Sequence, residues 1–159
     1  MASSAEFYKS LPKKRMASGA LFFDASGKLL VLRTTYKETW EIPGGVVEDD
    51  ESPREAVERE IKEEIGLSKH FTKLMCVDYQ HAEESRTESL MFIFDGGILN
   101  DEDLNSIKVD AGEIAEFRFV TSDEALQLCG PRLGRRIQNI MAVKDTGSFL
   151  YLENRELPL

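Results

Sequence analysis

The sequence is poor in cysteine, in basic residues and in long apolar runs, and each scarcity excludes a class of protein. Cys76 and Cys129 are its two cysteines, too few for a disulfide framework and without the paired spacing of a zinc site. Both lie among apolar residues, so we expect two buried free thiols in a reducing compartment, with one disulfide between them as the alternative. We assign neither cysteine a catalytic role.

Basic residues are outnumbered, with 20 Lys and Arg against 29 Asp and Glu and a formal net charge of −9. A nucleic-acid-binding protein normally carries a basic stripe, so no nucleic-acid partner is expected. A nucleotide substrate stays compatible with this charge, because a bound cation can supply positive charge locally.

Apolar runs are short throughout the chain. No stretch approaches the roughly 20 apolar residues of a membrane span, so no membrane partner is expected. The stretch 1–16 contains the basic residues 13–15 but no apolar run behind a basic start, so no signal peptide is expected. We therefore expect a cytoplasmic protein.

Apolar runs and turn residues alternate along the 159 residues. We expect strands at 17–23, 28–33, 72–80, 89–94 and 113–120, a short extended segment at 40–42 and a small strand after 148. The first two strands should form a hairpin. We expect helices at 53–65, from about 121 onward and at 131–143, and loops at 81–87 and 95–110. This order predicts a mixed α/β or α+β fold in a single domain over 1–159, with 1–15 as a loosely held tail.

The stretch 44–67 organises the rest of the chain, because it combines a glycine turn, an acidic loop and a helix with clear ends. Ser52 is a capping serine, Pro53 suits the first helical position and Glu55 completes a capping box. Gly66 suits the left-handed residue that ends a helix. The helix should therefore run from Pro53 to about Ile65.

Three glutamates share one stripe of this helix, beside an apolar stripe of Val57, Ile61 and Ile65. The glutamates are Glu60, Glu63 and Glu64. Like charges at this spacing destabilise a helix by a few tenths of a kcal/mol per pair. A carboxylate cluster on a rigid element suits a hard divalent cation, whereas the alternative is a solvated acidic face.

The spacing around the glutamates decides between these interpretations. From Gly45 to Leu67 the chain follows Gly-x5-Glu-x7-Arg-Glu-U-x-Glu-Glu-x-Gly-U, where U is aliphatic, and matches all nine constrained positions over 23 residues. In this stretch the chain resembles the Nudix hydrolase superfamily of the MutT type. The resemblance implies an α/β/α sandwich around a mixed sheet, and hydrolysis of a nucleoside diphosphate linked to another moiety by water attacking phosphorus.

The resemblance also implies roles for residues of the box. Metal ligands would be Glu60, Glu63, Glu64 and the backbone carbonyl of Gly44, holding Mg²⁺ or, in its place, Mn²⁺. Arg59 would pair with Glu51 and brace the loop against the helix. Dimers are frequent in the family, so a homodimer is compatible with this sequence, but no surface pattern demands one.

The general base is left open between two positions. Glu60 could act within the metal cluster, and Glu64 belongs to the same catalytic group. Glu113, just before the strand that ends at Val120, is the second position, because Nudix proteins often carry a catalytic or metal-binding glutamate there. Glu116 is the neighbouring alternative, and a strand-end surface charge is the structural alternative for Glu113.

Substrate recognition is less specified by the sequence. The residues we consider for contact with phosphate or base are Arg33, Tyr36, Trp40, Tyr79 and Arg86, with His81 in the same charged loop as Arg86. For Phe22 and Phe92 we favour core packing, and for Trp40 we favour packing beneath the glycine turn.

Two functions compete at this level. The first is a metal-dependent pyrophosphohydrolase of nucleoside triphosphates, nucleotide sugars or similar small molecules. The second is a Nudix-fold module that binds nucleotides or regulates without hydrolysis, and the intact glutamates count against it.

Overall fold

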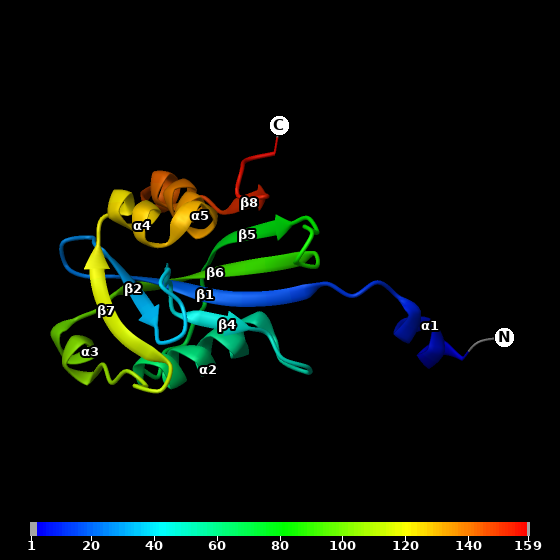
Figure 1. Cartoon of the computed structure of the whole chain (residues 1–159), viewed down its shortest axis with the longest axis horizontal. Helices are drawn as coiled ribbons and strands as arrows, with labels where there is room; N and C mark the ends of the chain where they lie inside the picture. The colour runs from blue at the N-terminus through cyan, green and yellow to red at the C-terminus, as the bar shows by residue number, and fades with distance from the viewer. Residues whose placement is uncertain (1–2, 159) are drawn as a thin grey trace.

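The computed structural model describes residues 3–158, which form a mixed sheet with helices on both faces (Figure 1). The strands are β1 (Arg15–Phe23), β2 (Leu29–Thr34), β3 (Trp40–Glu41), β4 (Gly44–Val46), β5 (Leu74–Gln80), β6 (Ser89–Ile98), β7 (Ile114–Val120) and β8 (Leu150–Glu153). The helices are α1 (Ser4–Ser10), α2 (Pro53–Ile65), α3 (Asp101–Ser106), α4 (Ser122–Leu128) and α5 (Gly130–Val143), with a 3₁₀ turn at Lys144–Thr146.

The strands follow the order β3-β2-β1-β6-β5-β8, with β4 beside β1 and β7 beside β2. The pairs β1–β6 and β5–β8 are parallel, and the other pairs are antiparallel. The expected hairpin of β1 and β2 is confirmed only at its turn, where Phe23 faces Leu29. Beyond this point β4 takes the neighbouring edge of β1 and β7 takes that of β2, so the two strands diverge.

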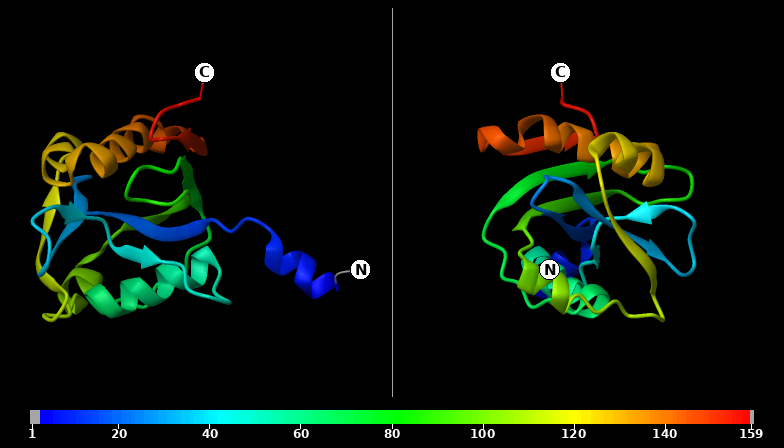
Figure 2. Two further views of the ribbon diagram at one scale, coloured as in Figure 1. Left: turned by 45° about the vertical axis from the view of Figure 1, so that its right-hand side comes forward. Right: turned by 90° about the vertical axis from the view of Figure 1, so that its left-hand side faces the viewer.

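The core lies in two layers, one on each face of the sheet. One cluster joins Leu21 and Val31 to Ile137 and Ile140 of α5. The other joins residues of the opposite face to Val57, Ile61 and Ile65 of α2. Views from two directions show α4 and α5 on one side and α2 with α3 on the other (Figure 2). The predicted α/β/α sandwich is therefore confirmed.

Helix α2 has the predicted ends. Ser52 accepts from the backbone of Glu55 and Glu55 accepts from the backbone of Ser52, which completes the capping box. Pro53 opens the helix, and Gly66 closes it at φ 74°. Its apolar stripe is fully buried, so packing against β1 fixes which way the glutamates face.

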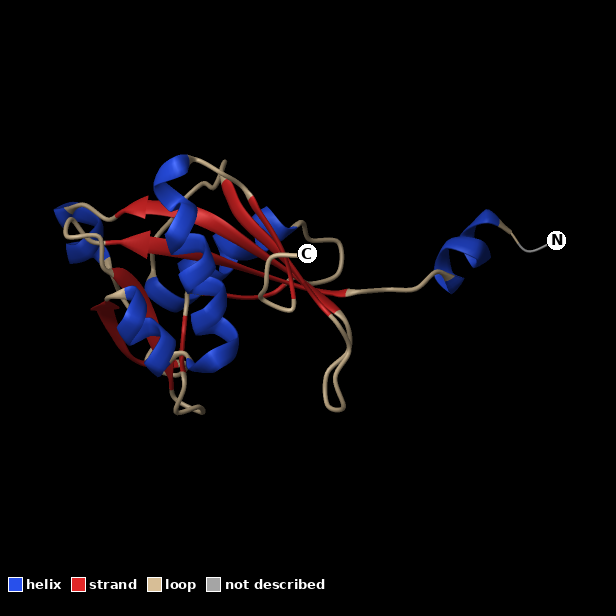
Figure 3. Cartoon of the chain, turned by 90° about the horizontal axis from the view of Figure 1, so that it is seen from above, coloured by secondary structure: helices blue, strands red, loops and turns tan. Residues whose placement is uncertain are grey.

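One expectation for the rest of the chain needs correction, and another gains detail. The stretch 95–110 is not one loop: β6 continues to Ile98, and α3 follows, capped by Asn100. The expected tail at 1–15 contains α1, which is capped by Ser3 and has no buried residue, while residues 1 and 2 lie outside the described part. Helix α1 projects away from the sheet (Figure 3). Short exposed helices lack an apolar stripe, so periodicity does not reveal them.

Cys76 and Cys129 are buried free thiols, as expected, and burial raises the pKa of each to about 12. A thiol with so high a pKa stays protonated and unreactive at neutral pH. Between residues 3 and 158, no helix is both long and apolar enough to cross a membrane.

Candidate active site

The glycine turn of strand β4 sets the position of the whole acidic segment. Gly44 has φ 143°, and a Cβ atom there would lie 2.2 Å from the carbonyl oxygen of Ser18. Glycine is therefore required by backbone conformation and by space. The pairing of Gly44 with Gly19 and of Gly45 with Ser18 holds the turn against the middle of β1.

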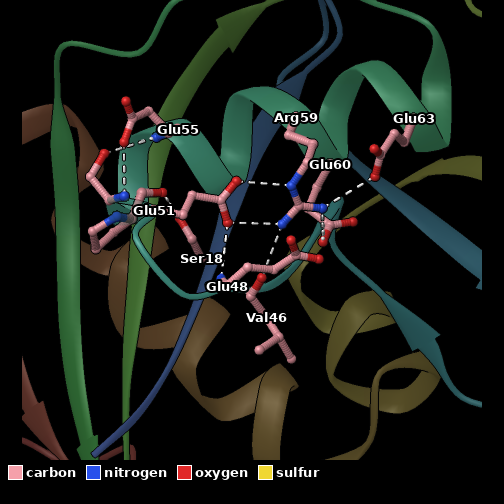
Figure 4. A network of polar contacts seen from close by, with 10 residues as sticks. Ser18, Val46, Glu48, Glu51, Glu55, Arg59, Glu60 and Glu63 are labelled. Atoms are coloured by element: carbon pink, nitrogen blue, oxygen red, sulfur yellow. Dashed lines mark hydrogen bonds and ion pairs between the residues drawn. The ribbon is translucent and has the colours of Figure 1, made fainter.

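Arg59 lies at the centre of the carboxylates of this segment (Figure 4). Its Nε and Nη2 donate to both carboxylate oxygens of Glu51, at 2.9 and 3.0 Å. Its Nη1 donates to Glu60 at 2.8 Å and to Glu63 at 3.2 Å, and its Nη2 also donates to the carbonyl of Val46. One guanidinium thus ties the loop, the glycine turn and the helix together.

Glu51 is the residue of the loop that completes this brace. It accepts from the backbone N–H of Glu48 at 3.0 Å in addition to Arg59. The hydrogen bond from Arg59 is the main cause that lowers the pKa of Glu51 to about 2. Glu51 is therefore ionised throughout the physiological range.

Glu64 and Glu60 differ from Glu51 because burial dominates their ionisation. Glu64 is 9% exposed, and its Oε2 accepts from the backbone N–H of Gly44 at 2.8 Å. Burial raises the pKa of Glu64 to about 8, and the charges of Glu60 and Glu113 add to this effect. Burial also raises the pKa of Glu60, although Arg59 opposes it. The positive charge near Glu60 and Glu64 does not balance the negative charge of these two carboxylates.

The fit of a divalent cation follows from this donor set. In the described range 3–158, no three carboxylate, imidazole or thiol groups already converge into a metal-binding cluster. Arg59 holds Glu60 and Glu63, and the Glu63 side chain is 56% exposed. Glutamate oxygens are nevertheless hard ligands, and the undercompensated charge of Glu60 and Glu64 is what a cation would neutralise. The residues present therefore fit a divalent cation when the side chains of Glu60 and Glu63 rotate away from Arg59.

Glu113 and Glu116, the two positions considered outside the box, differ in their surroundings. Glu113 lines the same cavity as the glutamates of α2, and its charge raises the pKa of both Glu60 and Glu64. Glu116 instead pairs with Arg118 at 2.5 Å and with Arg33 at 3.4 Å. The structure brings Glu113, and not Glu116, to the acidic cluster.

A cavity of about 850 Å³ opens over these carboxylates. Of the residues considered for substrate contact, Tyr36, Trp40, His81 and Arg86 line it. Tyr36 is 69% exposed, with the Nζ atom of Lys37 5.3 Å from its ring centre, whereas Trp40 is 5% exposed and has the guanidinium of Arg118 4.8 Å from its ring centre. Trp40 therefore acts mainly as packing in the cavity wall.

The structure does not bring the other residues considered for contact into the cavity. Arg33 faces Glu116 across the pairing of β2 with β7. The Tyr79 hydroxyl donates to Glu88 at 2.9 Å, and Phe22 is fully buried. Phe92 packs against the α2 core. Arg33 and Tyr79 thus have structural partners outside the cavity.

The sequence interpretation missed a second group of charged residues on the cavity wall. Arg15, Lys37, Arg132 and Arg136 line the cavity as well. Arg136 is 6% exposed and donates to Asp78, which is fully buried, at 2.7 Å. The one signal in the sequence was a charged residue, Asp78, within a strand that is otherwise largely apolar.

Comparison with known proteins identifies relatives of this arrangement. The family model described as NUDIX domain matches residues 13–138. The human protein "Nucleoside diphosphate-linked moiety X motif 6" is 29% identical over 161 residues, which cover 89% of this chain and 51% of that protein. An "RNA pyrophosphohydrolase" of Marinomonas sp. (strain MWYL1) is 37% identical over 57 residues, 36% of this chain and 35% of the relative. The chain thus spans about half or less of these relatives.

Among solved structures, the MutT protein from Methanosarcina mazei Go1 has a TM-score of 0.69 with 24% identity. The match covers 85% of this chain and 99% of that protein. At this identity the likeness shows the same fold.

Proposed function

Because this chain belongs to the Nudix family, whose domain model covers residues 13–138, we propose that it hydrolyses a pyrophosphate bond. The substrate is a nucleoside diphosphate linked to another moiety, such as a nucleoside triphosphate or a nucleotide sugar. The observation that carries the proposal is the pair of Glu64, which is buried, and Glu60, which is half-buried: both carboxylates line a cavity of about 850 Å³, and burial raises the pKa of each. The names of the relatives described above support a diphosphate as the substrate group.

Glu60, Glu63, Glu64 and the Gly44 carbonyl are the proposed ligands of a divalent cation, Mg²⁺ or Mn²⁺ in its place. Such a cation would neutralise the negative charge of the diphosphate and lower the pKa of a bound water. Arg59 and Glu51 are positioning residues, because they hold the glycine turn against the helix. Gly44 and Glu64 are already joined by a hydrogen bond of 2.8 Å, so the proposed ligands share one rigid frame.

We assign the general base to Glu113. In the described residues its carboxylate accepts no hydrogen bond, whereas the Glu60 carboxylate is engaged by Arg59 at 2.8 Å. A base must be able to accept the proton of the attacking water, and a free carboxylate beside the cluster meets this requirement. Tyr36 is the proposed stacking surface for the base of the nucleotide, and Arg86 a contact for its phosphate.

The test is incubation of the protein with Mg²⁺ and a panel of nucleoside triphosphates, nucleotide sugars and dinucleoside polyphosphates. We expect the nucleoside monophosphate or the matching phosphate product from at least one substrate, and loss of the product on chelation of the metal. A protein that binds these nucleotides but cleaves none of them would overturn the proposal in favour of a non-catalytic nucleotide-binding module.

A further inference from the structure

The cavity has two ends of opposite charge, in a chain whose net charge is −9. The end at α2 and β4 carries Glu48, Glu60, Glu63, Glu64 and, beside them, Glu113, with Arg59 among them. The other end carries Arg86, Arg132 and Arg136, with Lys37 close to Arg86, and we call it the basic end. Three carboxylates accompany these cations: Glu41 beside Lys37, Glu83, and Asp78 behind Arg136.

The pairing of strands fixes the separation of the two ends. Val46 pairs with Ala17, Ala17 with Met91, and Met91 with Asp78, in one row across β4, β1, β6 and β5. Neighbouring strands lie about 4.8 Å apart, so Val46 and Asp78 are separated by roughly 14 Å. This is a separation of backbones, and the long side chains that reach into the cavity from each end shorten the gap between the charged groups. One nucleotide ligand can therefore contact both ends.

The positive charges of the basic end are incompletely paired. Glu83 is the acceptor for Arg132, and it also lies 3.8 Å from Arg155. The charge of Arg86 lowers the pKa of Glu83 as well, after the larger effect of Arg132. The one exposed carboxylate of Glu83 therefore interacts with the charges of Arg86, Arg132 and Arg155. The Nη1 atom of Arg155 is buried without a hydrogen-bond partner in the described residues.

Like charges also lie near each other at this end, where Lys37 and Arg86 both line the cavity. The hydrogen bond to Glu41 raises the pKa of Lys37, whereas the charge of Arg86 acts against it, so the two cations are close enough to repel each other. They come from separate loops, 35–39 and 81–88, and both are exposed. An anion between the loops would relieve this repulsion and bring charge-assisted hydrogen bonds.

Resting on the proposed function, we propose that the basic end binds a second anionic group of the substrate, a phosphate or phosphodiester outside the scissile diphosphate. The acidic end then takes the diphosphate together with its cation, and the sugar lies between the two ends, where Ala17 lines the cavity. The substrate class is therefore a nucleotide with anionic groups on both sides of one sugar.

The experiment compares two non-hydrolysable ligands in the presence of Mg²⁺, α,β-methylene ADP and the same molecule with a 3′-phosphate, by calorimetric measurement of Kd. The wild type should bind the 3′-phosphorylated ligand about tenfold or more tightly, the size expected of hydrogen bonds to a charged group. Arg86→Gln should remove most of this preference. Glu83→Gln should increase it, because the competing carboxylate is gone.

Arg54→Gln is the matched control, since Arg54 is an exposed arginine of α2 that pairs with Glu58 and does not line the cavity. It should leave the preference unchanged. Equal affinity of the wild type for both ligands, or the same preference in Arg86→Gln and Glu83→Gln as in the wild type, would overturn the proposal. The experiment measures binding, so the two proposals can fail separately. Absence of hydrolysis would count against the proposed function alone. Hydrolysis without a preference for the 3′-phosphorylated ligand would count against this inference alone.

Discussion

The two ends of the cavity hold their charges in different ways. At the acidic end, one helix carries three glutamates around a single arginine, and burial raises the pKa of Glu60 and Glu64. The cations of the basic end come from separate segments, and Lys37, Arg86 and Arg132 are exposed. Charge held on a rigid helix suits chemistry that needs fixed geometry, whereas exposed charge suits selection of a ligand by the sign of the ligand's charge.

The largest expected effect should come from substitutions that remove a carboxylate of the acidic end. Glu60→Gln or Glu64→Gln should lower turnover by about 10²–10⁴-fold, because each removes a charge that the chemistry requires. The melting temperature should stay nearly the same or rise, since glutamine removes a carboxylate that burial disfavours in its charged form. Steady-state kinetics and thermal unfolding of the same preparations check this. Near-normal turnover in both variants would exclude the proposed metal site.

The next largest effect should come from removing the ion pair of Arg136 and Asp78 behind the basic end. Arg136→Met should destabilise the fold by about 3–5 kcal/mol, because it leaves the buried carboxylate of Asp78 without its partner. Denaturant unfolding measures the change. The double variant Asp78→Asn with Arg136→Met is the control and should recover much of the loss, since no unpaired charge remains buried. A single variant as stable as the wild type would show that the pair is dispensable.

A smaller effect concerns the brace between loop and helix. Glu51→Gln should reduce activity by about 10–100-fold, the range found for groups that orient metal ligands without touching the metal. Glu55→Gln, in the neighbouring capping box, is the comparison and should act mainly on stability. Activity assays with unfolding curves separate the two. An active Glu51→Gln protein would mean that the Arg59 contacts to Val46 and Glu60 suffice.

The smallest expected effect is the pH dependence of this brace. Arg59 lowers the pKa of Glu51 from 4.5 to about 2, so the ionised form stabilises the fold. That stabilisation is present above pH 4.5 and is lost as the pH falls toward 2, because the unfolded chain then takes up a proton first. The difference in unfolding free energy between wild type and Glu51→Gln should narrow over this range. A difference that stays constant over this range would show that the pair with Arg59 does not stabilise the fold.

How far the sequence predicted these two ends follows from where their residues lie in the chain. The acidic end is local, since 44–67 contains the turn, the caps, the apolar stripe and the glutamates together. The basic end is assembled by pairing of β1, β5 and β6 and by α5, and Asp78 lies 58 residues from Arg136. Short-range patterns carry no information about such contacts. For the same reason the sequence did not reveal that Arg33 pairs with Glu116 on a neighbouring strand.

The secondary structure shows the same division. Helix α2 has both signals that a sequence offers, terminal caps and an apolar face, and its predicted ends are correct. Helix α3 has a capping box at Asn100 but no buried residue, so its caps alone did not distinguish it from a loop. The divergence of β1 from β2 was also hidden, because a turn with glycine predicts a hairpin but not how far the two strands pair.

The most direct test of the account is a kinetic comparison of Glu64→Gln and Arg86→Gln on one substrate, a cleaved nucleotide that carries anionic groups on both sides of its sugar. We predict that Glu64→Gln lowers kcat by orders of magnitude with little change in KM, and that Arg86→Gln raises KM about tenfold with kcat nearly unchanged. Parallel changes in kcat and KM in both variants would contradict the division of the cavity into an end for chemistry and an end for recognition.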